Sequence, residues 1–277
     1  MKIKIHKPKN EILQNHIECF YSLQRNSNDK DITYFGFPSN TIFLTLSQDA
    51  KIKINKNDLS IENHPNEEIK SLLIIDNQKQ GSTTYKGRTN EITIYFKPLG
   101  INAFLTKPLS NYITNTVSEF NPFEDYNIAI NELFKIKDDT AKFEFLENYL
   151  ISKFNGFKHY ILHKALERIV NNNQPKISIA DLAESLGVSR ITLHKQFLLH
   201  IGTNPSQFIK IERFRNAIKL FTKQATKEQL IDIAYLAEYF DQSHMVKDFK
   251  SLTGYSPKKF FSKLSQIENN QINWIFN

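Results

Sequence analysis

The chain of 277 residues is 40% hydrophobic and 23% charged, with a formal net charge of +7 and a single cysteine, Cys19. This length accommodates two domains with ordinary cores, and one cysteine excludes an intramolecular disulfide and a multi-cysteine zinc site. No apolar run approaches the ~18 residues of a membrane span and no signal-peptide pattern follows Met1, so we expect a cytoplasmic protein that does not bind a membrane.

Residues 1–104 have the composition of β-strands. Asn, Asp, Gly and Pro separate short runs of β-branched and aromatic residues, and several runs alternate apolar with polar side chains as half-buried strands do. An antiparallel sheet curled into a small barrel or sandwich is the expected outcome. The runs are 32–38, 41–47, 51–55, 71–76 and 91–96. Aromatic side chains that would either line a pocket or fill the core are Phe35, Phe43, Tyr95 and Phe96.

After Gly100 the spacing of apolar residues becomes helical. The predicted helices are 101–109, 127–136 and 140–154. The last of them carries an apolar stripe at three- and four-residue spacing, formed by Phe143, Leu146, Leu150 and Phe154. This stripe either packs against its own domain or contributes to a homodimer interface.

An internal repeat occupies most of the remaining chain. It follows a predicted hinge at Asn155–Gly156 and a predicted helix over 158–173, and its two copies are 179–208 and 231–260. Sliding one copy onto the other by fifty-two positions aligns five pairs, which are Ile179 with Ile231, Phe197 with Phe249, Gly202 with Gly254, Pro205 with Pro257 and Phe208 with Phe260.

The first copy predicts two short helices joined by a tight turn. Ser178 and Ser189 are suitable N-cap residues, because a short side-chain oxygen can accept from the exposed amides of a helix start. Gly187 suits the left-handed residue that ends a helix, since it has no Cβ. Small Ala183 would let the two helices cross closely. This is the pattern of a helix-turn-helix motif.

The second copy has a turn that is one residue longer. Ala234 to Phe249 spans fifteen positions, against fourteen between the corresponding residues of the first copy, and Asp241 is the expected cap of the following helix. The run over 241–257, DQSHMVKDFKSLTGYSP, resembles the signature of the AraC/XylS family of transcription regulators. The DNA-binding unit of that family contains two such motifs in one chain, which matches the repeat found here.

Two features beyond the signature bear on this resemblance. The family usually has Gly-Phe-Ser where this chain has Glu238, Tyr239 and Phe240, and a left-handed Glu costs more than a left-handed Gly. Phe240 cannot cap a helix, so the second turn departs from the family pattern. Residues 38–46 and 94–100 resemble the cupin-like N-terminal domain of some AraC-type regulators, which implies a sensory role.

We therefore predict an α+β protein with an N-terminal β-rich, cupin-like barrel or sandwich followed by trailing helices, and a C-terminal all-α domain. In the latter, a linker helix over 206–223 would join the two motifs. At ~1.5 Å per residue it is roughly 27 Å long, which would hold two recognition helices about one DNA turn apart. The predicted regions are 1–155 (β-rich 1–104, helical 105–155), 158–264 and a tail over 265–277.

The positive charge is concentrated on the repeat. Residues 171–264 hold fourteen Lys and Arg against eight Asp and Glu, whereas the rest of the chain holds twenty-two against twenty-one. Double-stranded DNA is therefore the expected partner. By position in the predicted helices and by the resemblance, the base-reading candidates are Ile191, His194, Lys195, Gln242, Ser243 and Lys247. The candidates for phosphate contacts are Arg190, Lys210, Arg213, Arg215 and Lys250.

Other functions find less support in the sequence. The chain contains no GxxxxGK[ST], GxGxxG, GxSxG or HExxH motif, so we expect neither an enzyme nor a bound cofactor. His159 and His163 are four residues apart on a predicted helix, but no third metal ligand accompanies them. The alternative is a cupin-like protein that binds a metal or small molecule and whose helical domain binds a protein. For the DNA-binding interpretation, a small-molecule effector, RNA polymerase and a second copy of the chain are further candidate partners.

Overall fold

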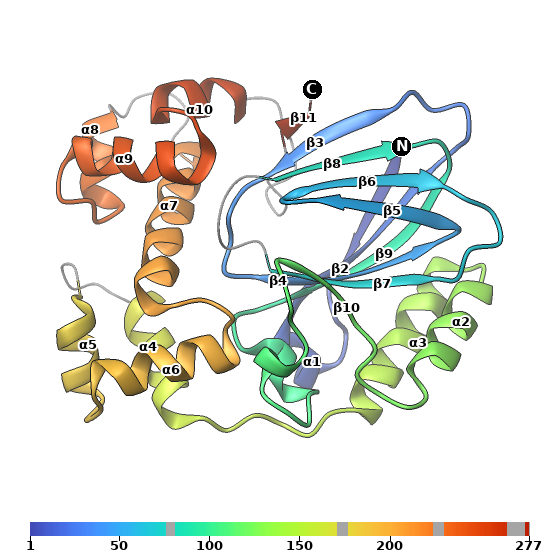
Figure 1. The fold of residues 1–277 in the computed structure, drawn as a ribbon, viewed down its shortest axis with the longest axis horizontal. Helices are drawn as coiled ribbons and strands as arrows, with labels where there is room; N and C mark the ends of the chain where they lie inside the picture. Colours follow the sequence, from blue (N-terminus) through green and yellow to red (C-terminus); the bar gives the residue numbers. More distant parts are fainter. Residues whose placement is uncertain (76–80, 171–176, 224–229, 265–274, 277) are drawn as a thin grey trace. The chain divides into compact units, whose positions relative to one another are not determined.

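The computed structural model describes residues 1–75, 81–170, 177–223, 230–264 and 275–276 (Figure 1). Contacts divide the chain into two compact units. The first unit consists of Met1–Thr33, Thr41–Ile75 and Ser82–Lys158, and the second gathers Tyr34–Asn40 and the chain from His159 onward. Among the described residues, no helix combines the length and apolarity that crossing a membrane would require.

Two β-sheets account for the strands of the N-terminal region, as the composition predicts. The first has the order β1-β2-β9-β4-β7-β10, and its described pairings are antiparallel. The second has the order β11-β3-β8-β6-β5, in which β6 and β8 run parallel. The strands are β1 Lys2–His6, β2 Ile17–Arg25, β3 Ile32–Gly36, β4 Ile42–Gln48, β5 Ala50–Asn55, β6 Asp58–Asn63, β7 Lys70–Ile75, β8 Gly81–Lys86, β9 Thr89–Phe96, β10 Val117–Glu119 and β11 Ile275–Phe276.

The α+β fold class is thereby confirmed, and the two sheets are compatible with the cupin-like expectation. The five sequence runs correspond to β3, β4, β5, β7 and β9, while β1, β2, β6, β8 and β10 were not predicted. Of the predicted tail, the structure describes β11, which pairs with Tyr34 and Phe35 of β3. The rest of that tail lies outside the described residues.

One face of the first sheet is covered by helices. Alternate residues of β4 and β9 point to this side, where Leu44, Ile94 and Phe96 join one buried core with α2 (Tyr126–Lys135) and α3 (Asp139–Ser152). Three members of the apolar stripe on α3 are buried in this core, and Phe154 is packed against it. The stripe therefore packs within its own domain, which was the alternative to a homodimer interface. A further short helix is α1, Glu11–His16.

The prediction of one helix over 101–109 is wrong. The chain makes two short 3₁₀ turns, η1 (Gly100–Ala103) and η2 (Leu109–Asn111), with Pro108 immediately before the second. A proline disfavours the α conformation in the residue that precedes it, and it has no amide to continue a hydrogen-bonded helix. The apolar periodicity that predicted one helix is therefore satisfied by two tight turns.

The opposite face of the first sheet carries a polar cluster. The hydroxyls of Tyr85 and Ser47 donate to the carboxylate of Glu91, at 2.8 and 3.0 Å. Tyr85 belongs to β8 and Glu91 to β9, so this hydrogen bond joins the two sheets. The Glu91 side chain is only 1% exposed, and its burial raises its pKa to about 7, against the hydrogen bonds that lower it. Phe43 and Tyr95, two of the pocket candidates, pack edge-to-face at 4.1 Å between ring centroids.

The C-terminal unit is helical, as predicted. Its largest core gathers Phe214, Phe249 and Phe260 with buried residues of the second motif. In the first motif, Leu182, Leu193, Phe197 and Phe208 are fully buried. The helices are α4 Tyr160–Val170, α5 Ile179–Ser185, α6 Arg190–His200, α7 Pro205–Lys223, α8 Leu230–Leu236, α9 Gln242–Thr253 and α10 Pro257–Leu264.

We expect Glu91 to make the first unit less stable as the pH rises. Its folded-state pKa, about 7, lies above the ordinary 4.5, so its contribution is fully favourable below pH 4.5 and is lost as the pH rises through 7. The whole shift corresponds to roughly 3 kcal/mol. Chemical denaturation of the wild type and of Glu91→Gln at pH 5 and pH 8 should show this loss in the wild type alone.

Glu62→Gln provides the matched control. Hydrogen bonds from Lys86 and Lys53 lower the pKa of this surface carboxyl, so its contribution is lost only in acid. The wild type and Glu62→Gln should therefore lose stability equally between pH 5 and 8. An equal loss in Glu91→Gln would contradict the assignment to Glu91.

Candidate nucleic-acid interface

The first helix-turn-helix motif has the predicted capping geometry. Ser178 accepts from the amide of Asp181 at 3.1 Å at the start of α5, and Ser189 accepts from the amide of Thr192 at 3.0 Å at the start of α6. Between them Gly187 is left-handed, with a φ of 66°. Its amide donates to the Glu184 carbonyl at 2.9 Å. The local sequence therefore fixes both helix starts and the turn between them.

The second motif repeats this turn with a residue that is not glycine. Glu238 has a φ of 63°, and its amide donates to the Tyr235 carbonyl at 3.0 Å. The next amide, of Tyr239, donates to Ala234 at 2.9 Å, as the amide of Val188 donates to Ala183 at 3.1 Å. Glu238 is thus the counterpart of Gly187. The departure noted in the sequence produces the expected left-handed Glu.

Phe240 is the additional residue of the longer turn. It lies between the turn and Asp241, whose carboxylate caps α9 by accepting from the amide of His244 at 2.6 Å. The helices before the insertion are therefore related by fifty-one positions, as Ala183 and Ala234 show, and those after it by fifty-two. The alignment of Ile179 with Ile231 is wrong for this reason. Ile179 corresponds to Leu230, and Ile231 is 57% exposed.

The second helix of each motif presents an outward face. Leu193 and Phe197 on α6, and Met245 and Phe249 on α9, are fully buried at equivalent positions. The outward positions also correspond, Ile191 with Ser243 and Lys195 with Lys247, after the offset of fifty-two. The six base-reading candidates are all exposed: Ile191, His194, Lys195, Gln242, Ser243 and Lys247.

The linker helix α7 packs against both motifs (Figure 1). Near its start Phe208 packs edge-to-face on Phe197 of α6, with 5.7 Å between ring centroids. In its middle Phe214 contacts Phe249 of α9 in the same way, at 4.9 Å. With 19 residues the helix is about 28 Å long at ~1.5 Å per residue. The second helix of each motif is thus attached to one continuous helix by its own core residues.

A buried carboxylate ties α7 to α9. Asp248 on α9 is 7% exposed and lies 3.5 Å from a nitrogen of each of Lys210, Arg213 and His244. Lys210 also donates to Ser251 at 2.8 Å, and the guanidinium of Arg213 lies over the Tyr239 ring at 5.7 Å. Two of the phosphate candidates, Lys210 and Arg213, are therefore engaged inside the unit.

A short segment of the N-terminal region also belongs to the second unit. Arg215 of α7 donates to the backbone carbonyls of Phe37 and Pro38, the latter at 2.7 Å. The ring of Phe37 is buried against Phe260, with 4.7 Å between centroids. Asn40 donates to the Phe208 carbonyl at 2.9 Å. No sequence pattern indicated this role, since Tyr34–Asn40 follows the composition of the strands around it.

Among the described residues, no group of three or more His, Cys, Asp and Glu side chains could hold a metal ion. The Nε2 atom of His159 lies 2.9 Å from Oε1 of Gln196, and its ring is 5.2 Å from that of His200. The side chain of His163, four residues along α4, is exposed. His159 thus contacts the first motif through Gln196.

The class of the C-terminal region follows from this geometry and from its relatives. Residues 182–263 match the family model described as a helix-turn-helix domain. The C-terminal region therefore contains an AraC-type helix-turn-helix domain, as the sequence signature indicated.

Two relatives are named as helix-turn-helix transcriptional activators. The chain is 29% identical over 108 residues to the transcriptional activator AarP of Providencia stuartii, covering 39% of this chain and 78% of AarP. It is 21% identical over 206 residues to the transcriptional activator RhaS of Mannheimia succiniciproducens, covering 72% of this chain and 73% of RhaS. A structure of ToxT from Vibrio cholerae bound to an unsaturated fatty acid is 15% identical and covers 91% of this chain and 96% of its own, with a TM-score of 0.45.

We expect Glu238→Gly to stabilise the second unit by about 1 kcal/mol. The left-handed conformation costs a residue with a Cβ ~1–2 kcal/mol, and glycine avoids this cost. Part of the gain is offset because glycine increases the conformational entropy of the unfolded chain. Thermal unfolding followed by circular dichroism should show a higher melting temperature. The mirror change, Gly187→Ala, should cost about the same amount. A Cβ at Gly187 would meet no atom within 4 Å, so only the backbone conformation is tested there.

A lower melting temperature for Glu238→Gly would show that the side chain of Glu238 stabilises the turn by more than its backbone conformation costs.

Proposed function

We propose that this protein is a sequence-specific DNA-binding transcription regulator that inserts α6 and α9 into successive major grooves. The observation that carries the proposal is the repetition of one helix-turn-helix geometry on a single linker helix, with exposed side chains at corresponding positions. An α-helix fits the major groove, where every base pair presents its own pattern of donors, acceptors and methyl groups. The basic surplus of residues 171–264 supports the same partner.

The base-reading residues differ between the two helices. On α6, Ile191 would contact a thymine methyl, and His194 and Lys195 would donate to guanine. On α9, Gln242 would pair with adenine, the hydroxyl of Ser243 would donate to or accept from a neighbouring base edge, and Lys247 would donate to one. The two motifs therefore favour different base sequences, and the expected operator half-sites are not identical.

For the phosphate contacts we place Arg190 and Lys250 first. Both side chains are exposed and lie on α6 and α9. Lys210 and Arg213 already surround Asp248, and Arg215 donates to two backbone carbonyls, so each would have to give up an internal interaction to reach DNA. Phosphate contacts contribute affinity and salt dependence rather than sequence preference.

The remaining parts of the proposal concern the first unit and its partners. This unit has a separate core, so it can hold a small-molecule effector without supplying any residue of the DNA-reading helices. We retain a second copy of the chain and RNA polymerase as partners, and the cytoplasm as the location. Sedimentation at micromolar concentration tests the dimer, and the apolar stripe of α3 is not available to form it.

The proposal predicts that Lys195→Ala and Lys247→Ala weaken binding to a selected operator by roughly tenfold each. Loss of a base-specific contact costs ~1–3 kcal/mol, whereas mixed-sequence DNA offers no such contact to lose. Gel shifts with an operator selected from random sequences, compared with mixed-sequence DNA, measure both effects.

Lys250→Ala is the matched control, because it removes an exposed lysine from α9. It should weaken binding to both DNAs about equally and reduce the slope of log affinity against log salt by about 1. If Lys195→Ala and Lys247→Ala both left operator binding unchanged, the assignment of the reading faces would be incorrect.

A further inference from the structure

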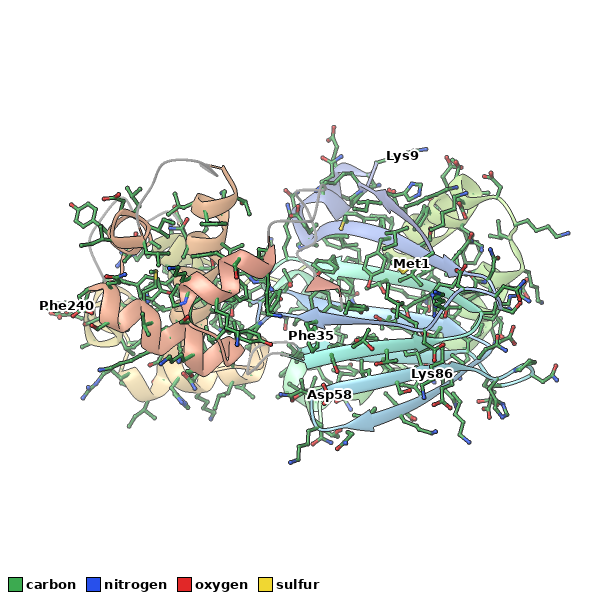
Figure 2. The ribbon with its side chains drawn as sticks, turned by 90° about the horizontal axis from the view of Figure 1, so that it is seen from above. Met1, Lys9, Phe35, Asp58, Lys86 and Phe240 are labelled. Atoms are coloured by element: carbon green, nitrogen blue, oxygen red, sulfur yellow. The ribbon has the colours of Figure 1, made fainter. Side chains whose placement is uncertain are left out.

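The residue inserted in the second turn is a phenylalanine that faces solvent. Phe240 is 78% exposed, although it lies between Tyr239, which is 3% exposed, and the cap residue Asp241. In Figure 2 its labelled side chain lies at the outer edge of the helical unit. Covering so exposed an apolar side chain with a partner would be favourable, because it would remove apolar surface from water.

Local interactions fix Phe240 beside the first turn of α9. Its amide lies 3.5 Å from Nδ1 of His244, and Asp241 caps the helix through the amide of the same His244. Only the cap residue Asp241 therefore separates Phe240 from the two exposed residues with which α9 begins, Gln242 and Ser243. In a helix-turn-helix protein, this N-terminal end of the recognition helix approaches the base edges.

The first motif offers an apolar side chain at the matching end of its recognition helix. Ile191, the second residue of α6, is 81% exposed. The corresponding residue of α9 is the polar Ser243, which cannot supply an apolar contact. Phe240, three residues before Ser243, therefore provides at the start of α9 the exposed apolar side chain that Ile191 provides at the start of α6.

Charge and chemistry identify the occupant of this surface. Exposed lysines lie further along α9 and on α10, namely Lys247, Lys250, Lys258, Lys259 and Lys263. This arrangement complements a polyanion rather than an apolar protein surface. In the major groove of DNA, the C5-methyl group of thymine is the apolar group that distinguishes a base, and phenylalanine is among the side chains that contact it.

We propose that Phe240 reads the 5-methyl group of a thymine in the half-site bound by α9. This inference rests on the proposed function and deepens it, because it assigns a specificity-determining role to a residue outside the recognition helix.

The test removes the methyl group alone. An operator is selected from random DNA with the wild-type full-length chain, and each thymine of the α9 half-site is then replaced in turn by deoxyuridine, which lacks only that methyl. Wild-type binding should weaken about fourfold at one position, the equivalent of ~0.8 kcal/mol for one buried carbon group. Phe240→Ala should bind the thymine and deoxyuridine operators equally, and Phe240→Leu should keep part of the difference.

Tyr235→Ala is the matched control, because Tyr235 is an equally exposed aromatic residue of α8 in the same motif, with 82% exposure. It should keep the full fourfold response to deoxyuridine. Circular dichroism and binding to mixed-sequence DNA check that each variant is folded, and truncation of so exposed a side chain should leave both unchanged.

The outcomes separate this inference from the proposed function. A fourfold response that persists in Phe240→Ala, or a wild type indifferent to every deoxyuridine in the half-site, would overturn the role of Phe240 and leave the regulator intact. A response lost in Tyr235→Ala and kept in Phe240→Ala would assign the methyl contact to α8 instead. Selection that yields no preferred sequence at all would remove the proposed function, and this inference with it.

Discussion

The attachment of two small helix pairs to one helix is the constraint on which the second unit depends. A helix-turn-helix pair of seven and eleven or twelve residues buries too little apolar surface to be stable alone. Both pairs gain a core by packing phenylalanines of their second helix on phenylalanines of α7, which are Phe208 in the first motif and Phe214 in the second. The same contacts that stabilise the unit therefore determine how α6 and α9 are held.

Charge reinforces the attachment at the second motif. Asp248 on α9 is buried beside the cationic Lys210 and Arg213 of α7, and the imidazole of His244 lies at the same distance from it. Removing one partner would destabilise the unit, because it would leave a buried charge that the other partners cannot fully compensate. The Asp248 carboxylate holds Lys210 and Arg213 of α7 inside the unit. Other lysines and arginines of this basic domain remain exposed.

The contrast between the two turns shows how a repeat can diverge without losing its geometry. The hydrogen bonds that close the turn are made by backbone amides, at Gly187 and Val188 in one motif and at Glu238 and Tyr239 in the other. Because no side chain takes part, the sequence of the turn can change at the cost of backbone strain. The additional Phe240 is accommodated after these bonds and before the cap, where it leaves both helices unaltered.

The sequence by itself determined those features that depend on neighbouring residues. Helix caps at Ser178, Ser189 and Asp241, the left-handed turns and the inward phenylalanines could be predicted, because capping and periodicity are local. The class of the C-terminal region was predicted from the resemblance of residues 241–257 to a family signature. Five of the ten strands that the structure describes before α2 were predicted from their composition and alternation.

Only the tertiary structure decided which charged and polar side chains remain exposed. Lys210, Arg213 and Lys250 look alike in the sequence, yet the first two lie beside Asp248 and the third is exposed. It also revealed the burial of Glu91 between two sheets and the place of Tyr34–Asn40 in the second unit. These outcomes depend on residues that are distant in the chain, and a local pattern contains no information about which distant group will supply the partner of a charge.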